Sequence, residues 1–246
     1  MNSIITLKNI TKIFGENHST RRIALKNINL EINENEFFIF IGPSGSGKST
    51  LLRIISGLEK KYGGEVIFGN GIKKSDFSFV FQQFALLPWL TVSENIALGL
   101  IAHGIPLKNR LKRVGLELKR FGLEKFANSH IKELSGGMRQ RVGIARALAT
   151  DPKIIFLDEP FSELDSFTAE ELRQDLLKIW QETKITIVMV THIIEEALEL
   201  SDRIAVLTKS PGTIEKIVVN NLARPRQKRS QDFYNLEDEL HKIIKP

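Results

Sequence analysis

The chain of 246 residues contains no cysteine. Disulfide bridges and cysteine-ligated metal centres are therefore excluded, which fits a protein from a reducing compartment. Uninterrupted apolar runs are short, such as residues 37–41 and 154–157. A membrane-spanning helix needs about 20 apolar residues, so we expect no transmembrane segment. The first residues also lack the basic and apolar stretches of a secretory signal peptide.

Glycine and proline, with 17 and 8 residues, are too few for a collagenous or low-complexity chain. The length corresponds to one or two domains. Lysine and arginine number 35 against 29 aspartates and glutamates, a formal net charge of +6. Such an excess is compatible with nucleic-acid binding, but also with a position near anionic lipid or with no functional meaning. Composition therefore leaves the class of partner open.

Apolar segments of strand length alternate with helical patterns in two parts of the chain. Residues 37–41, 154–157 and 185–190 have the composition of central strands that are covered on both faces. Strands separated by helices predict an α/β fold with a mostly parallel sheet. Further strands are expected at 23–32, 65–68, 77–81 and 204–207.

The stretch from about residue 84 to residue 150 is more helical. Thr91 and Glu94 have the spacing of a capping box, which predicts the start of a helix. Further along, apolar residues recur at steps of three and four. The basic residues between them then face solvent, so we interpret this segment as an amphipathic helix and not as a nucleic-acid site. The apolar stripe consists of Leu107, Leu111, Val114, Leu118 and Phe121.

Residues 42–49, with the sequence GPSGSGKS, match the pattern G-x-x-x-x-G-K-[ST] at every fixed position. The glycines let backbone N–H groups converge on phosphate oxygens, and the helix that follows adds its unpaired N–H groups and its dipole. Lys48 supplies a positive charge for the terminal phosphates, and the Ser49 hydroxyl is a ligand for Mg²⁺. The motif predicts a nucleoside triphosphate site formed by Gly42, Pro43, Ser44, Gly45, Ser46, Gly47, Lys48, Ser49 and Thr50.

Two carboxylates, Asp158 and Glu159, follow the expected strand 154–157. Ligands of parallel sheets bind beyond the carboxyl ends of the strands, and strand alternation points the two side chains in different directions. We assign Asp158 to Mg²⁺ and Glu159 to the attacking water as general base. Without the phosphate loop upstream, such a pair would more often mark the start of a helix.

His192 and Gln82 come just after the expected strands 185–190 and 77–81. A lone histidine is usually structural, but the predicted sheet edge favours contact between His192 and the terminal phosphate. The amide oxygen of Gln82 is a candidate third ligand for Mg²⁺, beside Ser49 and Asp158.

Residues 134–141, with the sequence LSGGMRQR, resemble the signature of ATP-binding-cassette (ABC) ATPases. Other elements of that family occur in the expected order: Phe14 resembles the aromatic residue that stacks on adenine, Gln82 the Q-loop glutamine, 162–165 the D-loop and His192 the switch histidine. The resemblance covers residues 4–220. It implies a P-loop NTPase (RecA-like) core with an N-terminal antiparallel β subdomain and a helical insertion at about 84–150. The ABC domain would span 1–221 and a basic, helical tail 222–246.

The signature residues Ser135, Gly136 and Gly137 combine a good N-cap with exposed N–H groups, a second anion site. The resemblance implies a head-to-tail dimer in which these residues of one copy cover the γ-phosphate held by Lys48 of the other. Met138 replaces the usual glutamine, Glu163 the usual alanine of the D-loop, and Phe14 the commoner tyrosine. None of these departures removes a phosphate donor, a metal ligand or the base.

Residues 84–92, 210–214 and 221–226 resemble the importer subunits that serve permeases for nitrate, sulfonates and taurine. This branch implies a peripheral ATPase at the cytoplasmic face of the membrane, with ATP and Mg²⁺ as cofactors. It also implies membrane permease subunits that contact 84–92, an external solute-binding protein, and no nucleic acid. In an alternative interpretation of that segment, Leu86, Leu87 and Trp89 are core residues.

Two other functions are compatible with a phosphate loop. One is a soluble ABC-type ATPase acting on nucleic acid or ribosomes, although relatives of that kind usually carry two cassettes or long coiled coils. The other is a small-molecule kinase, which leaves Ser135, Gly136 and Gly137 unexplained.

Overall fold

The computed structural model describes residues 2–15 and 21–244. The chain divides into two compact units. The first unit combines Met1–Ile72 with Trp180–Pro246, and the second unit is Lys73–Ile179. The predicted limits of the domain, the insertion and the tail remain predictions.

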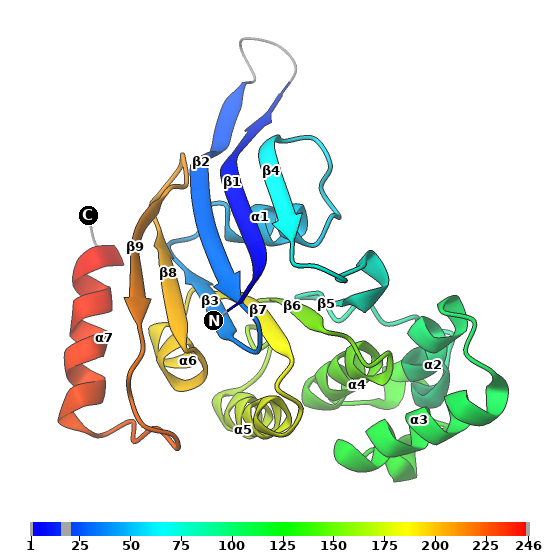
Figure 1. Ribbon diagram of the computed structural model, residues 1–246. Coiled ribbons are helices and arrows are strands. Elements are labelled where there is room, and N and C mark those ends of the chain that lie inside the picture. Colours follow the sequence, from blue (N-terminus) through cyan, green and yellow to red (C-terminus); the bar gives the residue numbers. More distant parts are fainter. Residues whose placement is uncertain (1, 16–20, 245–246) are drawn as a thin grey trace. The chain divides into compact units, whose positions relative to one another are not determined.

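An antiparallel sheet in the first unit has the strand order β2-β1-β4 (Figure 1). It consists of β1 (Ser3–Phe14), β2 (Arg22–Asn33) and β4 (Gly63–Phe68). The apolar residues of one face are buried, including Ile5, Leu7 and Ile28. The predicted strands 23–32 and 65–68 are confirmed, whereas the sequence pattern did not predict β1.

Parallel strands form the second sheet of this unit. β3 (Phe37–Ile41) lies between β7 (Thr186–Thr191) and β8 (Arg203–Leu207) and is parallel to both. All five residues of β3 are buried, as its apolar sequence predicts for a central strand. The strand β9 (Ile214–Val219), which was not predicted, pairs antiparallel with β8.

Three helices pack against this parallel sheet. α1 (Lys48–Ile55) contacts β7, α6 (Ile194–Leu200) contacts β3, and α7 (Gln231–Ile244) contacts β8 and α6. The apolar residues Phe233 and Leu240 of α7 are buried. The helical pattern predicted near the end of the chain is therefore confirmed.

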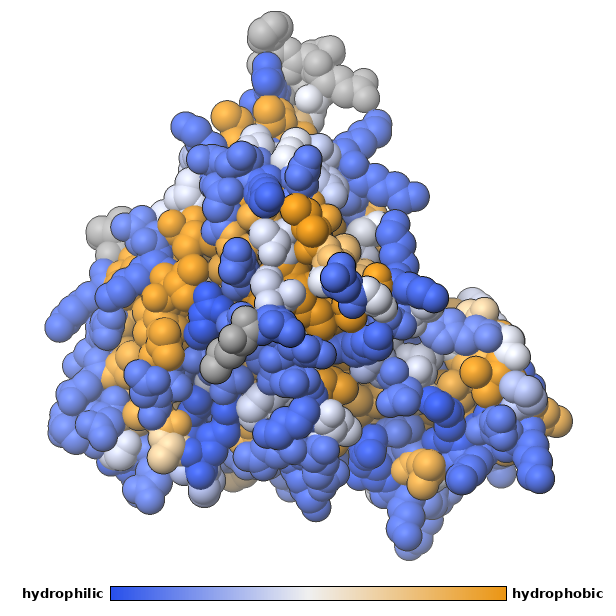
Figure 2. Space-filling view, in the orientation of Figure 1, coloured by the Kyte–Doolittle hydropathy of each residue, from blue (hydrophilic) through white to orange (hydrophobic). Residues whose placement is uncertain are grey.

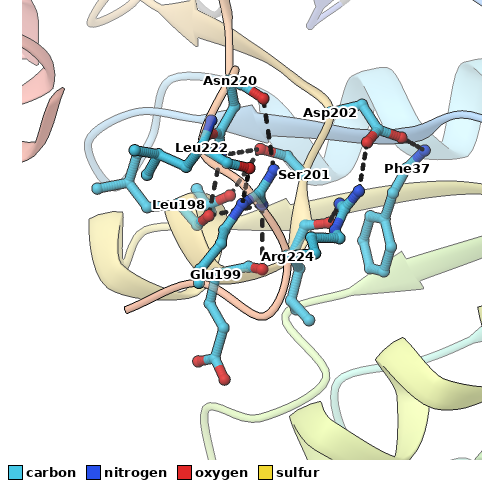
Figure 3. A network of polar contacts seen from close by, with 11 residues as sticks. Phe37, Leu198, Glu199, Ser201, Asp202, Asn220, Leu222 and Arg224 are labelled. Carbon is cyan, nitrogen blue, oxygen red and sulfur yellow. Dashed lines mark hydrogen bonds and ion pairs between the residues drawn. The ribbon is translucent and has the colours of Figure 1, made fainter. Parts of the chain in front are cut away.

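The segment between β9 and α7 is tied to α6 by side chains that bind the end of the helix (Figure 3). Arg226 Nη1 donates hydrogen bonds to the carbonyl groups of Leu198 and Glu199, at 2.7 and 3.0 Å. Arg224 donates to the carbonyl group of Leu200 and also pairs with Asp202. The last carbonyl groups of a helix have no partner within the helix, so these two arginines cap α6.

The second unit contains a parallel strand pair and most of the helices. β5 (Phe77–Val80) pairs with β6 (Ile154–Asp158). The helices α2 (Val92–Ala102), α3 (Leu107–Arg120) and α4 (Gly136–Ala149) pack together, and α5 (Ser166–Thr183) begins in this unit. The predicted capping box is confirmed, since Thr91 Oγ1 accepts from Glu94 N and Glu94 Oε2 accepts from Thr91 N.

The apolar stripe of α3 is buried in its second half alone. Val114, Leu118 and Phe121 are 3–7% exposed, whereas Leu107 and Leu111 are 60% and 64% exposed. The predicted amphipathic helix is confirmed, but Leu107 and Leu111, the first two residues of its apolar stripe, are exposed to solvent. The spacing of apolar residues predicts which side of a helix they lie on. It does not predict how far the neighbouring helices extend along that side, and this decides which of the residues are buried.

Hydrophilic side chains cover most of the face shown in Figure 2, with smaller groups of apolar side chains between them. Among the described residues, every helix is too short or too polar to cross a membrane.

Candidate active site

The phosphate loop connects β3 with α1 and has a backbone that glycine alone fits. Gly45 and Gly47 have φ angles of 79° and 89°, in the left-handed region. A methyl group at Gly47 would lie 2.7 Å from Leu25 Cδ2, and one at Gly42 would lie 2.6 Å from the carbonyl oxygen of Leu207. The loop therefore keeps its N–H groups unobstructed by side chains.

The ammonium group of Lys48 is held inside this loop. Its Nζ donates to the carbonyl oxygens of Gly42 and Pro43, at 2.8 and 3.0 Å. The hydroxyl of Ser46 is buried and has no hydrogen-bond partner in the described part of the chain. A buried cation, an unpartnered hydroxyl and the positive end of α1 together suit a triphosphate.

His192 leaves the sheet beside the phosphate loop. Ile41 at the end of β3 is in register with Thr191 at the end of β7, so the residues that follow, Gly42 and His192, lie at the same edge. Thr191 Oγ1 accepts from Ile193 N at 3.1 Å and donates to Glu196 Oε2 at 2.6 Å. These bonds fix the turn that carries the exposed His192.

Phe14, the last residue of β1, is 44% exposed. The Lys12 Nζ atom lies 4.6 Å from the centre of its ring. Lys12 is buried, pairs with Glu59 at 3.2 Å and donates to the carbonyl oxygen of Lys61 at 2.6 Å. The ring is thus supported from one side, and its exposed surface is available to stack on a planar ligand.

In the second unit, Gln82 and the acidic pair follow neighbouring strands. Val80 is in register with Leu157, so Gln82 and Glu159 come two residues later at the same edge. Gln82 Nε2 donates to Ser162 Oγ at 3.4 Å, and Ser162 Oγ donates to the carbonyl oxygen of Glu159 at 3.0 Å. The predicted Q-loop, acidic pair and D-loop are therefore in contact.

The two carboxylates differ in burial and in backbone conformation. Asp158 is 1% exposed at the end of β6, whereas Glu159 is partly exposed. Glu159 has a φ angle of 44°. A non-glycine residue in this region costs about 1–3 kcal/mol, a strain that is common at functional sites. The chain bends at Glu159, directly after the end of β6.

The signature residues begin α4, as predicted. Ser135 is its N-cap, with Oγ accepting from Met138 N at 3.3 Å. A methyl group at Gly137 would lie 2.3 Å from Thr168 Cγ2 on α5. Asp165 in turn accepts from Thr168 N at 3.0 Å, and this bond lowers the pKa of Asp165. The glycine therefore lets the start of the signature helix pack directly on the start of α5.

Two residues that no motif predicted hold the segment after Gln82. Arg146 on α4 donates to the carbonyl oxygens of Phe84 and Ala85, at 2.9 and 2.7 Å, and burial lowers its pKa. Asn95 on α2 is fully buried and binds backbone groups of residues 87, 90 and 91. The sequence held one signal for Arg146, because it is the one charged residue among the small and apolar residues 144–149 of the expected helical stretch.

The segment 84–92 exposes apolar side chains. Trp89 is 69% exposed, and Leu86 and Leu87 are partly exposed. The interpretation of these three residues as core is therefore wrong.

The predicted site residues lie in both units. Phe14, residues 42–50 and His192 belong to the first, and Gln82, residues 135–137, Asp158 and Glu159 belong to the second. The candidate magnesium ligands are likewise divided, with Ser49 in the first unit. The described residues contain no group of three or more histidines or carboxylates that would hold a metal by itself.

Residues 25–162 match the family model described as ABC transporter. The aliphatic sulfonates import ATP-binding protein of Bacillus thuringiensis subsp. konkukian is 44% identical over 239 residues, which cover 96% of this chain and 94% of that protein. The nitrate import ATP-binding protein of a Synechocystis species is 40% identical over 238 residues, which cover 91% and 88%.

A solved dimeric structure of an ATP-binding cassette, in a post-hydrolysis state with ADP and Pi, has a TM-score of 0.78 and 42% sequence identity. The match covers 89% of this chain and 99% of that one. It confirms the predicted α/β fold with a P-loop NTPase core and an N-terminal antiparallel sheet. With the family match and the full-length relatives, the phosphate loop and the signature helix identify this chain as a member of the ABC transporter family, an ATP-binding-cassette ATPase.

Proposed function

We propose that the chain is the ATP-hydrolysing subunit of an importer that moves a small solute, of the sulfonate or nitrate class, through a separate membrane permease. The relatives named above are import subunits of these two kinds. The observation that carries the catalytic part is the phosphate loop, with Lys48 held inside it and His192 at the same sheet edge.

The first unit binds the nucleotide. Lys48 exchanges its bonds to the carbonyl groups of Gly42 and Pro43 for bonds to the β- and γ-phosphates, and the loop N–H groups bind the remaining oxygens. Phe14 stacks on adenine with its exposed surface. Because the loop N–H groups are fixed in advance, binding requires little reorganisation of the backbone.

Ser49, Gln82 and Asp158 would hold Mg²⁺, since hydroxyl, amide and carboxylate oxygens are the ligands that this ion prefers. When bound there, the ion would neutralise the charge that develops on the phosphates.

Glu159 acts on the attacking water. Its carboxylate accepts a proton while the water oxygen forms a bond to the γ-phosphorus and the bond from that phosphorus to the β–γ bridging oxygen breaks. His192 donates a hydrogen bond to a γ-phosphate oxygen and stabilises the charge there. The products are ADP and inorganic phosphate.

A second copy of the chain completes each site. One chain has one phosphate loop and one signature, and the solved relative is dimeric. In the proposed head-to-tail dimer, Ser135, Gly136 and Gly137 of one copy cover the γ-phosphate held by Lys48 of the other. Binding of ATP closes the dimer, and hydrolysis opens it.

The permease is proposed to contact the exposed apolar segment 84–92, which Arg146 and Asn95 attach to α4 and α2. These contacts would transmit the movement of the dimer, as it closes and opens, to the permease. The subunit would then lie at the cytoplasmic face of the membrane, and an external solute-binding protein would supply the solute.

Release of phosphate from ATP by the purified chain with Mg²⁺ tests the activity, with Lys48→Ala as the inactive control. Uptake of a labelled sulfonate or nitrate tests the proposed role in import, in cells that lack the gene and receive it again as the wild type or as a variant. We expect the wild-type gene to restore uptake and a Glu159→Gln gene to leave it absent. Normal uptake of both solutes without the gene would contradict the proposed import function.

A further inference from the structure

The start of β2 runs alongside the phosphate loop. A methyl group at Gly47 would lie 2.7 Å from Leu25 Cδ2 and 3.1 Å from the carbonyl oxygen of Ala24. Two residues earlier in the loop, a methyl group at Gly45 would lie 4.0 Å from Nη2 of Arg22. The guanidinium group of Arg22 therefore reaches the loop beside Gly45, where the backbone is exposed.

Arg22 also lies beside the aromatic residue that is proposed to stack on adenine. Phe14 and Arg22 are direct partners across the antiparallel pair β1 and β2, and the side chains of such partners point to the same face of the sheet. Arg22 is thus the neighbour of Phe14 in the sheet, and its guanidinium group reaches the phosphate loop at Gly45. A nucleotide that stacks on Phe14 and extends its phosphates to Lys48 passes this position.

Among the described residues, no partner neutralises the charge of Arg22. Within residues 2–15 and 21–244, its guanidinium group makes no hydrogen bond and no ion pair. The neighbouring cation Lys12, in contrast, is buried and paired with Glu59. An exposed guanidinium with five N–H donors matches the oxygens of a phosphate group, which it can bind through two parallel hydrogen bonds.

We propose that Arg22 binds the phosphate chain of the nucleotide beside Gly45, as a second cation in addition to Lys48. The inference rests on the proposed function, because it assumes that ATP occupies the loop. The fixed positions of the phosphate-loop motif do not include Arg22, which reaches the loop from a strand some 20 residues earlier in the chain. Arg22 is thereby a binding residue for the charge of the ligand, whereas Phe14 binds its base.

Calorimetric titration with ATP and with adenosine tests this proposal, in protein that carries Glu159→Gln so that ATP is not consumed. We expect Arg22→Ala to raise the Kd for ATP about tenfold, the loss typical of a charge-assisted hydrogen bond. The Kd for adenosine should stay within about twofold, and Arg22→Lys should recover part of the affinity for ATP. The matched control is Arg21→Ala, which removes the same charge from the exposed neighbour in the chain.

Several results would overturn the assignment. They are an unchanged Kd for ATP in Arg22→Ala, an equal loss for ATP and adenosine, or an equal loss for ATP in Arg21→Ala. Circular dichroism checks that the variants are folded. A parent protein that binds no ATP, or a Lys48→Ala variant that binds it normally, would instead contradict the proposed function.

Discussion

Glu159 follows the buried strand β6, which ends at Asp158. Its φ angle of 44° is outside the range of a strand, so the backbone changes direction at this residue. If Glu159 is the general base, Glu159→Gln keeps the size and polarity of the side chain but cannot accept a proton. We expect ATP hydrolysis to slow by at least about 10²-fold while ATP binding persists. Phosphate release and nucleotide titration measure the two effects, and normal turnover by the variant would refute the role.

Glu117 on α3 is 7% exposed and pairs with Arg120 at 2.9 Å. Burial raises the pKa of its carboxyl above the usual value of 4.5, although the arginine opposes this. The folded state therefore binds the proton more tightly than the unfolded chain. The stability from this site is fully present below the unfolded pKa and is lost as the pH rises through the folded pKa.

In a Glu117→Gln variant the side chain cannot ionise, so the variant does not lose stability at this site as the pH rises. We expect the variant to gain stability relative to the parent protein as the pH rises from about 4 to about 7. The free energy of unfolding from urea denaturation at each pH measures the difference, with Glu133→Gln as a control for the loss of one exposed carboxylate. A difference that does not change with pH would show that Glu117 titrates as it does in the unfolded chain.

The helix α6 has seven residues, and a helix of this length is not stable alone. Its last carbonyl groups are bound by Arg224, which Figure 3 shows, and by Arg226. Burial lowers the pKa of Arg226 to about 10, so the side chain is still charged at neutral pH. Arg226→Ala removes the hydrogen bonds to two carbonyl groups of α6 and two longer ones, of 3.4 Å, to the carbonyl groups of Asn220 and Leu222. The substitution should lower the free energy of unfolding by about 2 kcal/mol.

Urea denaturation measures this loss. Arg229→Ala is the matched control, since it removes the same charge from an exposed residue of the same segment. We expect the control to change stability by less than about 0.5 kcal/mol. Equal effects of the two substitutions would mean that net charge matters here and the cap on α6 does not.

The two halves of α3 offer a direct comparison within one helix. Leu118 is 7% exposed and Leu111 is 64% exposed. We expect Leu118→Ala to cost about 2–3 kcal/mol of stability, because it leaves a cavity, and Leu111→Ala to cost less than about 0.5 kcal/mol. Thermal or urea denaturation tests both, and a large loss at Leu111 would show that the first half of α3 is covered in solution.

The strands that the sequence did not predict differ from those that it did. β3 is apolar at every position and is central. β1, in contrast, shifts register several times against β2, which interrupts the alternation that marks a half-buried strand. β9 pairs with β8 in the sheet of the first unit and has one buried residue, Val218. Periodicity therefore predicts central strands better than bulged or mostly exposed ones.

Across the whole chain, the predicted site residues come from short motifs because phosphate and carboxylate chemistry restricts which residue types can follow a strand. The positions of Gly42, His192 and Glu159 just after strand ends could be predicted in this way. Arg146 could not, since its role depends on which loop the fold brings against α4. The same limit applies to Arg22, whose neighbour Gly45 is distant in sequence.

The assembly that these motifs require can be tested by the state of association. A single chain supplies one phosphate loop and one signature, so the proposed site is complete in a dimer alone. We expect Glu159→Gln protein saturated with ATP and Mg²⁺ to sediment as a dimer, because ATP joins Lys48 of one copy to Ser135 of the other. Adding Ser135→Arg should abolish this association, since the longer side chain fills the space at the start of α4, while nucleotide binding by the monomer persists. A monomer in the Glu159→Gln protein, at nucleotide concentrations that saturate it, would contradict the shared site, and a dimer that survives Ser135→Arg would mean that the copies join through another surface.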